Sequence, residues 1–361
     1  MTCGARQPAT ATSAITNGNL EFIRTTMMAL RRRKVAWRPV ASETTSMTHA
    51  GPHIPASRNQ VGTHSPTALL HGLTVDVEDW FHILESADAP QPQTWAQQES
   101  RVAYNTMRLL ALFDRHQVRA TFFCLGWVAE QCADLVREIA NRGHEIGSHS
   151  HSHQLIDDLG RDGFARDLDR SIEALLKAGA SSVKLFRAPG FSLGCGQTWA
   201  LPVLASRGIS IDASMFLAPR AHGGIALQRA RPFEIVLADG QRITEVPTVP
   251  RKLGNLALPF AGGGYLRLLP WPVLRSCFEA SQAAGSPAIV YVHPREIDSN
   301  QPRMPLSPLR RFKYYVGLDS TLPKLEKILQ NYRFGPLSQV VATTVPDQPV
   351  YFSAAGELTT G

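Results

Sequence analysis

The sequence predicts an α/β fold in which parallel strands alternate with helices. From residue 73 onward, short apolar strands and amphipathic helical stripes follow one another in turn. Polar clusters occur where several of these strands end, which is where the sites of parallel α/β folds lie. With 361 residues, 43% of them hydrophobic, the chain can bury a full core. We therefore expect a parallel sheet with helices outside it, either open or closed into a barrel.

The first half of the chain carries most of this alternation. The predicted elements are a strand at 73–77, a helix at 102–113, a strand at 118–125, a helix at 128–141, a strand at 145–148, a helix at 164–178, a strand at 183–186, a helix at 198–207 and a strand at 209–211. Each strand is separated from the next by a helix, so neighbouring strands are expected to run parallel.

Residues 213–287 interrupt the alternation. They contain Pro- and Gly-rich linkers and a predicted hairpin at 233–249. The glycine run at 262–264 is not followed by Gly-Lys-Ser/Thr, so it predicts a tight connection or a substrate-facing loop rather than a phosphate loop. A last strand is predicted at 288–292 and a last helix at 322–330.

The first 72 residues differ in composition from the rest. They carry eight basic and two acidic residues, which accounts for six of the seven net positive charges. We interpret residues 1–72 as a disordered basic leader or as a start assigned too early. Because the remaining chain is nearly neutral, no nucleic-acid partner is expected for it.

Cysteine usage and the order of charges favour a cytoplasmic location. The five cysteines are scattered and are expected to be reduced thiols. The basic residues 31–34 follow the apolar stretch at 20–30, whereas a secretory signal places them before it. No apolar run approaches the ~20 residues that span a bilayer, so no transmembrane segment is expected.

Three carboxylates stand at the end of the first predicted strand. The strand's period of two places Asp76 and Glu78 on one face, and Asp79 follows them. Like charges this close repel one another, and burying them costs desolvation energy. A cation is therefore expected beside them, and a divalent metal is the natural candidate.

Histidines that complete a metal site follow a later strand. His149 and His153 are four residues apart, the spacing that places two imidazoles on one face of a helical turn. Two histidines and one carboxylate leave coordination positions open, as a catalytic site requires. Either Glu78 or Asp79 supplies the carboxylate, and His151 is expected to point away.

Two further strand ends supply the groups that a hydrolytic reaction needs. Asp76 is the expected general base, and Arg187 can hold it ionised because a guanidinium grips a carboxylate in a fixed fork. His293 follows the last buried strand and can protonate a leaving amine. The alternatives are a surface arginine for Arg187 and a satisfied core histidine for His293.

These motifs, in this order, resemble those of the polysaccharide deacetylases, the nodulation-type chitooligosaccharide deacetylase family. They are Thr-Val-Asp-Val-Glu-Asp at 74–79, His-Ser-His-Ser-His at 149–153, Arg-Ala-Pro at 187–189 and Val-His-Pro at 292–294. Details such as Trp-Phe-His at 80–82 and His-Pro-Arg-Glu at 293–296 resemble the subgroup encoded with exosortase-linked exopolysaccharide clusters. The resemblance covers residues 73–337, with a subgroup-specific portion from about 213 and a polar tail at 338–361.

The resemblance implies a distorted (β/α) barrel and metal-dependent removal of acetyl groups from N-acetylated sugars, with zinc as the expected metal. The roles that it implies are general base for Asp76, metal ligand for His149 and His153, partner of the base for Arg187 and general acid for His293. It also implies an acetylated polysaccharide or lipid-linked oligosaccharide substrate and an association with exopolysaccharide synthesis proteins. The expected substrate-binding residues are Trp80, Pro189, Phe191 and Tyr265.

The chain departs from the family pattern at two points. Family members commonly carry Thr-Phe-Asp-Asp-Gly, whereas Val77 stands where the second Asp would be. The carboxylate ligand must then be Glu78 or Asp79. The family's fourth motif is matched only loosely, by residues 212–216, with Asp212 as the expected orienter of His293.

Other functions use the same residues. A hydrolase of another amide or of an O-acetyl ester needs the same acid, base and metal. The replacement at Val77 is also compatible with a carbohydrate-binding protein that has lost catalysis. A nucleic-acid binder would use the basic leader.

Overall fold

One mixed sheet forms the centre of the computed structural model, which describes residues 68–84, 89–218, 222–253, 256–353 and 356–360. The expected leader at 1–72 lies almost entirely outside these residues. Within them, eleven strands form one sheet in the order β10-β1-β2-β3-β4-β5-β7-β6-β12-β13, with β11 beside β1.

The strands from β10 to β7 pair in parallel, as the sequence predicted. They are β1 (Leu70–Val77), β2 (Thr121–Cys124), β3 (Glu145–Ser148), β4 (Leu185–Phe186), β5 (Ile211–Asp212), β7 (Arg242–Glu245) and β10 (Ile289–Val292). β1 is buried along its whole length because it lies between β10 and β2. The polar residues that follow these strands are brought to one end of the sheet.

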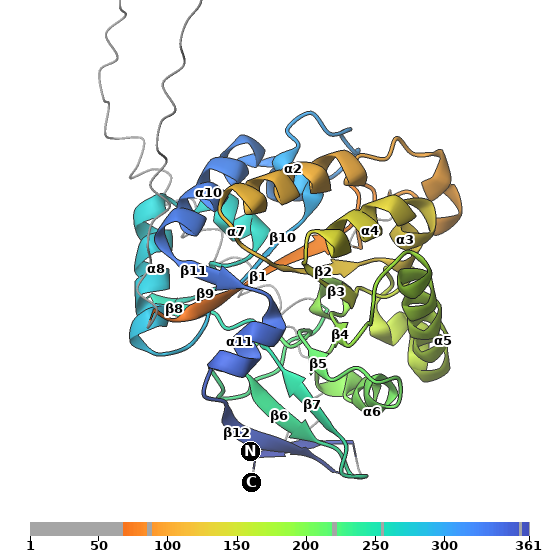
Figure 1. Ribbon diagram of the computed structural model, residues 1–361, viewed down its shortest axis with the longest axis vertical. Helices are drawn as coiled ribbons and strands as arrows, with labels where there is room; N and C mark the ends of the chain where they lie inside the picture. Colours follow the sequence, from red (N-terminus) through yellow and green to blue (C-terminus); the bar gives the residue numbers. More distant parts are fainter. Residues whose placement is uncertain (1–67, 85–88, 219–221, 254–255, 354–355, 361) are drawn as a thin grey trace, which may run out of the picture. The chain divides into compact units, whose positions relative to one another are not determined.

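Helices surround the parallel strands (Figure 1). They are α2 (Val102–Arg115), α3 (Gly126–Gln131), α4 (Ala133–Asn141), α5 (Ile156–Lys177), α6 (Ala200–Ala205), α7 (Gly263–Leu268), α8 (Trp271–Ala283), α9 (Pro308–Tyr315), α10 (Thr321–Asn331) and α11 (Leu337–Thr343). α2 shows the expected stripe, since Leu109, Leu112 and Phe113 all lie in the core. The single helix predicted at 128–141 is instead two helices, because Cys132 between them has a non-helical backbone.

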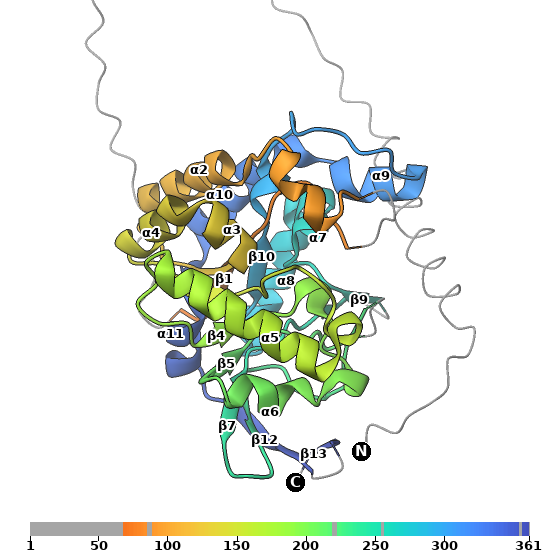
Figure 2. The same cartoon turned by 90° about the vertical axis from the view of Figure 1, so that its right-hand side faces the viewer.

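The C-terminal part of the chain extends the sheet. β6 (Phe233–Val236) pairs with β7 in the predicted hairpin, β12 (Asp347–Phe352) pairs with β6, and β13 (Leu358–Thr360) pairs with β12. β11 (Arg333–Gly335) pairs with β1, while β8 (Arg251–Leu253) and β9 (Leu256–Leu258) pair with each other. In Figure 2, β12 and β13 lie at the opposite end of the view from α9.

The prediction of a polar tail at 338–361 is wrong. This stretch contains most of α11 together with β12 and β13, and both Val350 and Leu358 are buried in the core. The error has a physical cause, since short edge elements with one buried residue each give little periodic signal. Short 3-10 turns complete the described elements: η1 (Pro92–Gln97), η2 (Pro189–Phe191), η3 (Cys195–Gln197), η4 (Pro294–Ile297) and η5 (Leu318–Ser320).

Cysteine pairing and helix composition bear on two expectations about cellular context. Cys124, Cys132 and Cys277 are free thiols, but Cys195 is disulfide-bonded, so the expectation of reduced cysteines is wrong for Cys195. Among the helices of the described ranges, none has both the length and the apolar character that crossing a membrane requires.

Replacing Val350 tests whether β12 belongs to the folded core. Val350 is fully buried, whereas Val345 is 72% exposed and provides a matched control. We expect Val350→Ala to lower the free energy of unfolding by about 1–3 kcal/mol and Val345→Ala to change it by less than about 0.5 kcal/mol. Urea unfolding measures both values. Equal, small effects of the two substitutions would show that this strand is not packed.

Candidate active site

Two carboxylates at the C-terminal end of β1 face the same space. Asp76 and Glu78 are 2% and 3% exposed. Nε2 of His293 lies 3.0 Å from Oε1 of Glu78 and 3.8 Å from Oδ2 of Asp76. Because both carboxylates lie near the same imidazole, they are on the same face of the strand, as the expected period of two predicts.

Arg187 binds Asp76 from the end of β4. Its side chain is fully buried, and Nη1 donates to Oδ1 of Asp76 and to the hydroxyl of Thr74, each at 2.7 Å. Nε donates to the carbonyl oxygen of Ala213, and the guanidinium lies over the ring of Phe123. Arg187 binds Asp76 through one nitrogen and not through the two-pronged contact expected from the sequence. Oδ2 of Asp76 therefore stays turned toward His293. The alternative of a surface arginine is excluded.

Glu78, His149 and His153 bring three ligand atoms within 4.8 Å of one another. Nε2 of His153 lies 3.4 Å from Oε2 of Glu78, and Nε2 of His149 lies 3.9 Å from Oε1. Within the described part of the chain, the buried Oε2 of Glu78 receives no hydrogen bond. A buried carboxylate oxygen without a donor, facing two imidazole nitrogens, fits a divalent metal such as zinc.

The protonation of the two histidines also suits metal binding. Nδ1 of His149 lies 2.8 Å from the carbonyl oxygen of Arg187. Because a carbonyl can only accept, Nδ1 carries a hydrogen, and Nε2 is the ring nitrogen that faces Glu78. Burial lowers the pKa of His153 to about 4 despite the nearby Glu78, so this imidazole is neutral at pH 7. Neutral imidazole is the form that binds metals.

The two histidines lie on a loop after β3, so the prediction of a helical turn is wrong. Ser150 and His153 have φ values of 66° and 51°, in the left-handed region. The carboxylate of Asp167 holds the loop by accepting the backbone N–H groups of residues 151–152. The loop still brings the two rings together, with centroids 5.2 Å apart. His151 faces Glu130, with 3.1 Å between Nε2 and Oε1, and points away as expected.

Asp79 lies outside this group of three ligand atoms. Its Oδ2 accepts hydrogen bonds from the hydroxyl of Ser100 and from the backbone N–H groups of residues 101–102. Asp79 thus satisfies donors at the start of α2, where helices need an acceptor. Of the two carboxylates that the sequence left open, Glu78 is the one that faces the histidines.

The carboxylate of Glu296 lies beside the imidazole of His293, a neighbour that the sequence analysis did not predict. Nδ1 of His293 lies 3.2 Å from Oε2 of Glu296. Burial alone would lower the pKa of His293, but the carboxylates of Glu78 and Glu296 outweigh burial and raise it to about 10. The spacing of these two residues could have indicated the contact. Glu296 stands three residues after His293, the residue that begins the helical turn, and this spacing is typical of a capping box.

Asp212, the expected orienter of His293, lies elsewhere. It is the register partner of Glu245 across β5 and β7, and both side chains are fully buried. Burial raises the pKa of Asp212 to about 6 and that of Glu245 well above its usual value, so the pair retains a proton. Asp212 accepts the hydroxyl of Ser214, which in turn accepts the backbone N–H of Ala188. The pair therefore supports the chain beside Arg187.

The four expected substrate-binding residues occupy different environments. Trp80 and Phe191 are 8% and 4% exposed, and Pro189 is buried in η2. Nε1 of Trp80 donates to the carbonyl oxygen of Glu99, and the ring of Phe191 packs on Tyr291. Tyr265, on α7, is half-buried against the core.

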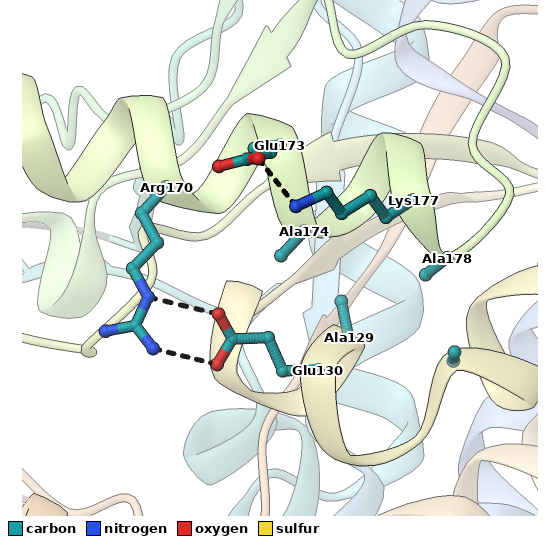
Figure 3. Close-up of a pocket in the computed structure, with 8 residues that line it drawn as sticks. Ala129, Glu130, Arg170, Glu173, Ala174, Lys177 and Ala178 are labelled. Carbon is teal, nitrogen blue, oxygen red and sulfur yellow. Dashed lines mark hydrogen bonds and ion pairs between the residues drawn. The ribbon is translucent and has the colours of Figure 1, made fainter.

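A separate surface hollow of about 290 Å³ lies between α3 and α5 (Figure 3). Arg170 binds Glu130 through two hydrogen bonds of 3.0 Å, and Lys177 pairs with Glu173 at 2.6 Å. The charged groups that line the hollow thus pair with one another. The groups suited to chemistry gather instead at the end of β1.

Comparison with known families divides the chain into two matched segments. Residues 95–195 match the family model described as "Polysaccharide deacetylase", and residues 213–342 match one described as "Domain of unknown function (DUF3473)". The first model covers much of the chain between the carboxylates of β1 and η3. The second contains His293 and Glu296.

Curated relatives match part of the chain. The chain is 28% identical over 141 residues to "Peptidoglycan-N-acetylglucosamine deacetylase" of Bacillus cereus, a match covering 35% of this chain and 51% of that protein. It is 32% identical over 73 residues to "Chitooligosaccharide deacetylase" of Rhizobium leguminosarum, covering 20% and 34%. The chain spans about half, or less, of the length of these relatives. The matches support placing it with the polysaccharide deacetylases.

The fold can be compared with a solved structure. A crystal structure from Mycobacterium smegmatis, of a protein assigned to the polysaccharide deacetylases, aligns with a TM-score of 0.51 and 19% identity. The alignment covers 78% of this chain and 96% of that one. The fold is the distorted (β/α) barrel of the polysaccharide deacetylase type, as the sequence predicted.

The buried pair of Asp212 and Glu245 predicts a pH-dependent stability. The native pair keeps a proton as pH rises from the usual 3.8 of aspartate to about 6, where the unfolded chain has lost it. The native state then binds more protons, so the free energy of unfolding falls across this window. Glu245→Gln removes one of the two charges and should flatten that fall.

The test is urea unfolding between pH 4 and 8. Glu234→Gln is the matched control, because Glu234 lies on the same hairpin but is exposed and paired with Arg242. Wild type and Glu234→Gln should lose stability in parallel, while Glu245→Gln loses less. Three parallel curves would contradict the shared proton.

Proposed function

We propose that this protein is a metal-dependent hydrolase that removes N-acetyl groups from the amino sugars of a polysaccharide or exopolysaccharide precursor. The observation that supports this most is the convergence of a metal-type ligand set, a carboxylate and a histidine around the end of β1. Binding a carbohydrate requires neither a base nor an acid, so this set favours catalysis over the binding-protein alternative.

The ligand set consists of Glu78, His149 and His153. A divalent cation, with zinc as the expected metal, would act there as a Lewis acid toward the acetyl carbonyl and would lower the pKa of the attacking water. Asp79 has no part in this set because its carboxylate serves the start of α2. Glu78 thus takes the ligand role that Val77 cannot fill.

Asp76 acts as the general base. Arg187 occupies Oδ1 and leaves Oδ2 turned toward the reaction space, where it can accept a proton from water. The ion pair with Arg187 fixes the direction of the carboxylate.

His293 acts as the general acid. Water adds its oxygen to the acetyl carbon, the C–N bond breaks, and Nε2 of His293 gives its proton to the departing nitrogen. The products are acetate and the free amino sugar, with the water's proton accepted by Asp76. An O-acetyl ester would use the same groups, with an alcohol in place of the amine.

The substrate class rests on similarity and on the sequence motifs. The relatives named above are deacetylases of acetylated glycans, and motifs at 75–82 and 293–298 resemble the exosortase-linked exopolysaccharide subgroup. We infer an acetylated polysaccharide or lipid-linked oligosaccharide as substrate and action at the cytoplasmic face of the inner membrane beside exopolysaccharide synthesis proteins.

Metal content tests the ligand set. After dialysis against zinc and then buffer, we expect wild-type protein to retain about one zinc per chain, and Glu78→Gln and His149→Ala to lose it. His151→Ala and Asp79→Asn are matched controls that should retain it, because both side chains face away from the three ligand atoms. Retention by Glu78→Gln together with loss by Asp79→Asn would reverse the assignment.

Turnover tests the base. Asp76→Asn should retain zinc but release acetate from N-acetylglucosamine oligomers at least about 100-fold more slowly, because general base catalysis contributes roughly 10²–10⁴-fold. Acetate release by the wild type should also stop when a chelator removes the metal. If zinc-loaded wild-type protein releases no acetate from any acetylated glycan tried, the deacetylase proposal fails.

A further inference from the structure

We propose that α7 positions the general acid through a buried chain of three side chains, in which Arg267 fixes Glu296 and Glu296 orients His293. Its catalytic consequence rests on the proposed function, whereas the orientation itself does not. The two positioning residues belong to the segment of unknown function at 213–342.

The first contact in this series of side chains is the one between Glu296 and the imidazole of His293. Oε2 of Glu296 accepts the backbone N–H of His293 at 3.0 Å and lies 3.2 Å from Nδ1 of the same residue. Among the described residues, no group is in hydrogen-bond geometry with Nδ1, and its ion-pair contact is with Oε2 of Glu296. An ionised carboxylate can only accept, so this contact favours a hydrogen on Nδ1. Nε2 then faces Asp76 and Glu78.

Arg267 supplies the charge that holds Glu296. Nη1 of Arg267 donates to Oε1 of Glu296 at 2.9 Å, and both side chains are only 3% exposed. Nη2 donates to the carbonyl oxygen of Lys313, which fixes the guanidinium from a second side. Removing one partner would leave an uncompensated buried charge, so each residue constrains the other.

The glycine run makes room for this pair. A Cβ atom at Gly263 would lie 1.8 Å from Oε2 of Glu296 and 2.0 Å from Oε1. At Gly262 it would lie 2.1 Å from the hydroxyl of Tyr291. The glycine run is the start of α7, where the backbone packs directly against the carboxylate of Glu296.

The contact of Glu296 with Nδ1 affects how His293 can deliver a proton. An imidazole can deliver a proton from Nε2 only if its ring is held in one orientation, and a carboxylate at Nδ1 provides this hold. Glu296 is therefore a positioning residue, acting through His293. The segment at 213–342 contributes to the active site and is not an accessory to it.

Leaving-group dependence distinguishes positioning from general damage. An amide needs a proton on its departing nitrogen, whereas 4-nitrophenyl acetate releases a stable phenolate that needs none. We expect Glu296→Gln and Arg267→Met to lower kcat for N-acetylglucosamine oligomers by about 10–100-fold, with KM unchanged. Their rates on 4-nitrophenyl acetate should fall by less than about 3-fold.

Glu279→Gln is the matched control, because it removes a glutamate from an exposed ion pair with Arg275 on α8. It should leave both rates unchanged. Equal losses on both substrates in Glu296→Gln, or no loss on either, would overturn the positioning role. If the wild type hydrolyses neither substrate, the proposed function fails. The orientation of the His293 ring is then tested by nuclear magnetic resonance alone.

Nuclear magnetic resonance of ¹⁵N-histidine-labelled protein reports the orientation without turnover. We expect a protected Nδ1–H resonance of His293, identified by its loss in His293→Gln. It should disappear or exchange rapidly in Glu296→Gln and Arg267→Met, and persist in Glu279→Gln. A resonance unaffected by Glu296→Gln would overturn the inference whatever the activity.

Discussion

The burial of two carboxylates at the end of β1 is the constraint on which the rest of this structure depends. Asp76 and Glu78 are both nearly inaccessible to water, and an ionised carboxylate in that position needs a compensating cation. Arg187 provides one for Asp76. Glu78 faces His149, His153 and His293, and one of its oxygens receives no hydrogen bond from the described residues. The ends of β3, β4 and β10 deliver these partners.

The same rule of paired buried charges extends beyond β1. Glu296 is compensated by Arg267, and the pair of Asp212 and Glu245 is relieved by a retained proton. Each arrangement fixes a group that meets the reaction space: Glu296 fixes His293, and Asp212 supports the chain beside Arg187. Buried charged groups thus either pair with an opposite charge or share a proton, which is how they tolerate burial.

The groups that follow strands could be predicted from the sequence, whereas those that depend on pairing could not. Asp76 and Glu78 could be placed together because a strand has a fixed period. The partnership of Asp212 and Glu245 could not, because it depends on the register of β5 and β7, which the sequence does not state. His149 and His153 were brought together correctly but through the wrong geometry, since the loop is held by Asp167 from α5. β12 was missed because a short edge strand carries almost no periodic signal.

Glu78, His149 and His153 are proposed to hold a metal ion. Anomalous diffraction from zinc-loaded crystals, measured on both sides of the zinc absorption edge, can locate this ion. We expect one strong peak, at about 2.0–2.2 Å from a Glu78 oxygen and from Nε2 of both histidines. A peak bound through Asp79 or His151, or zinc found only elsewhere on the molecule, would contradict it.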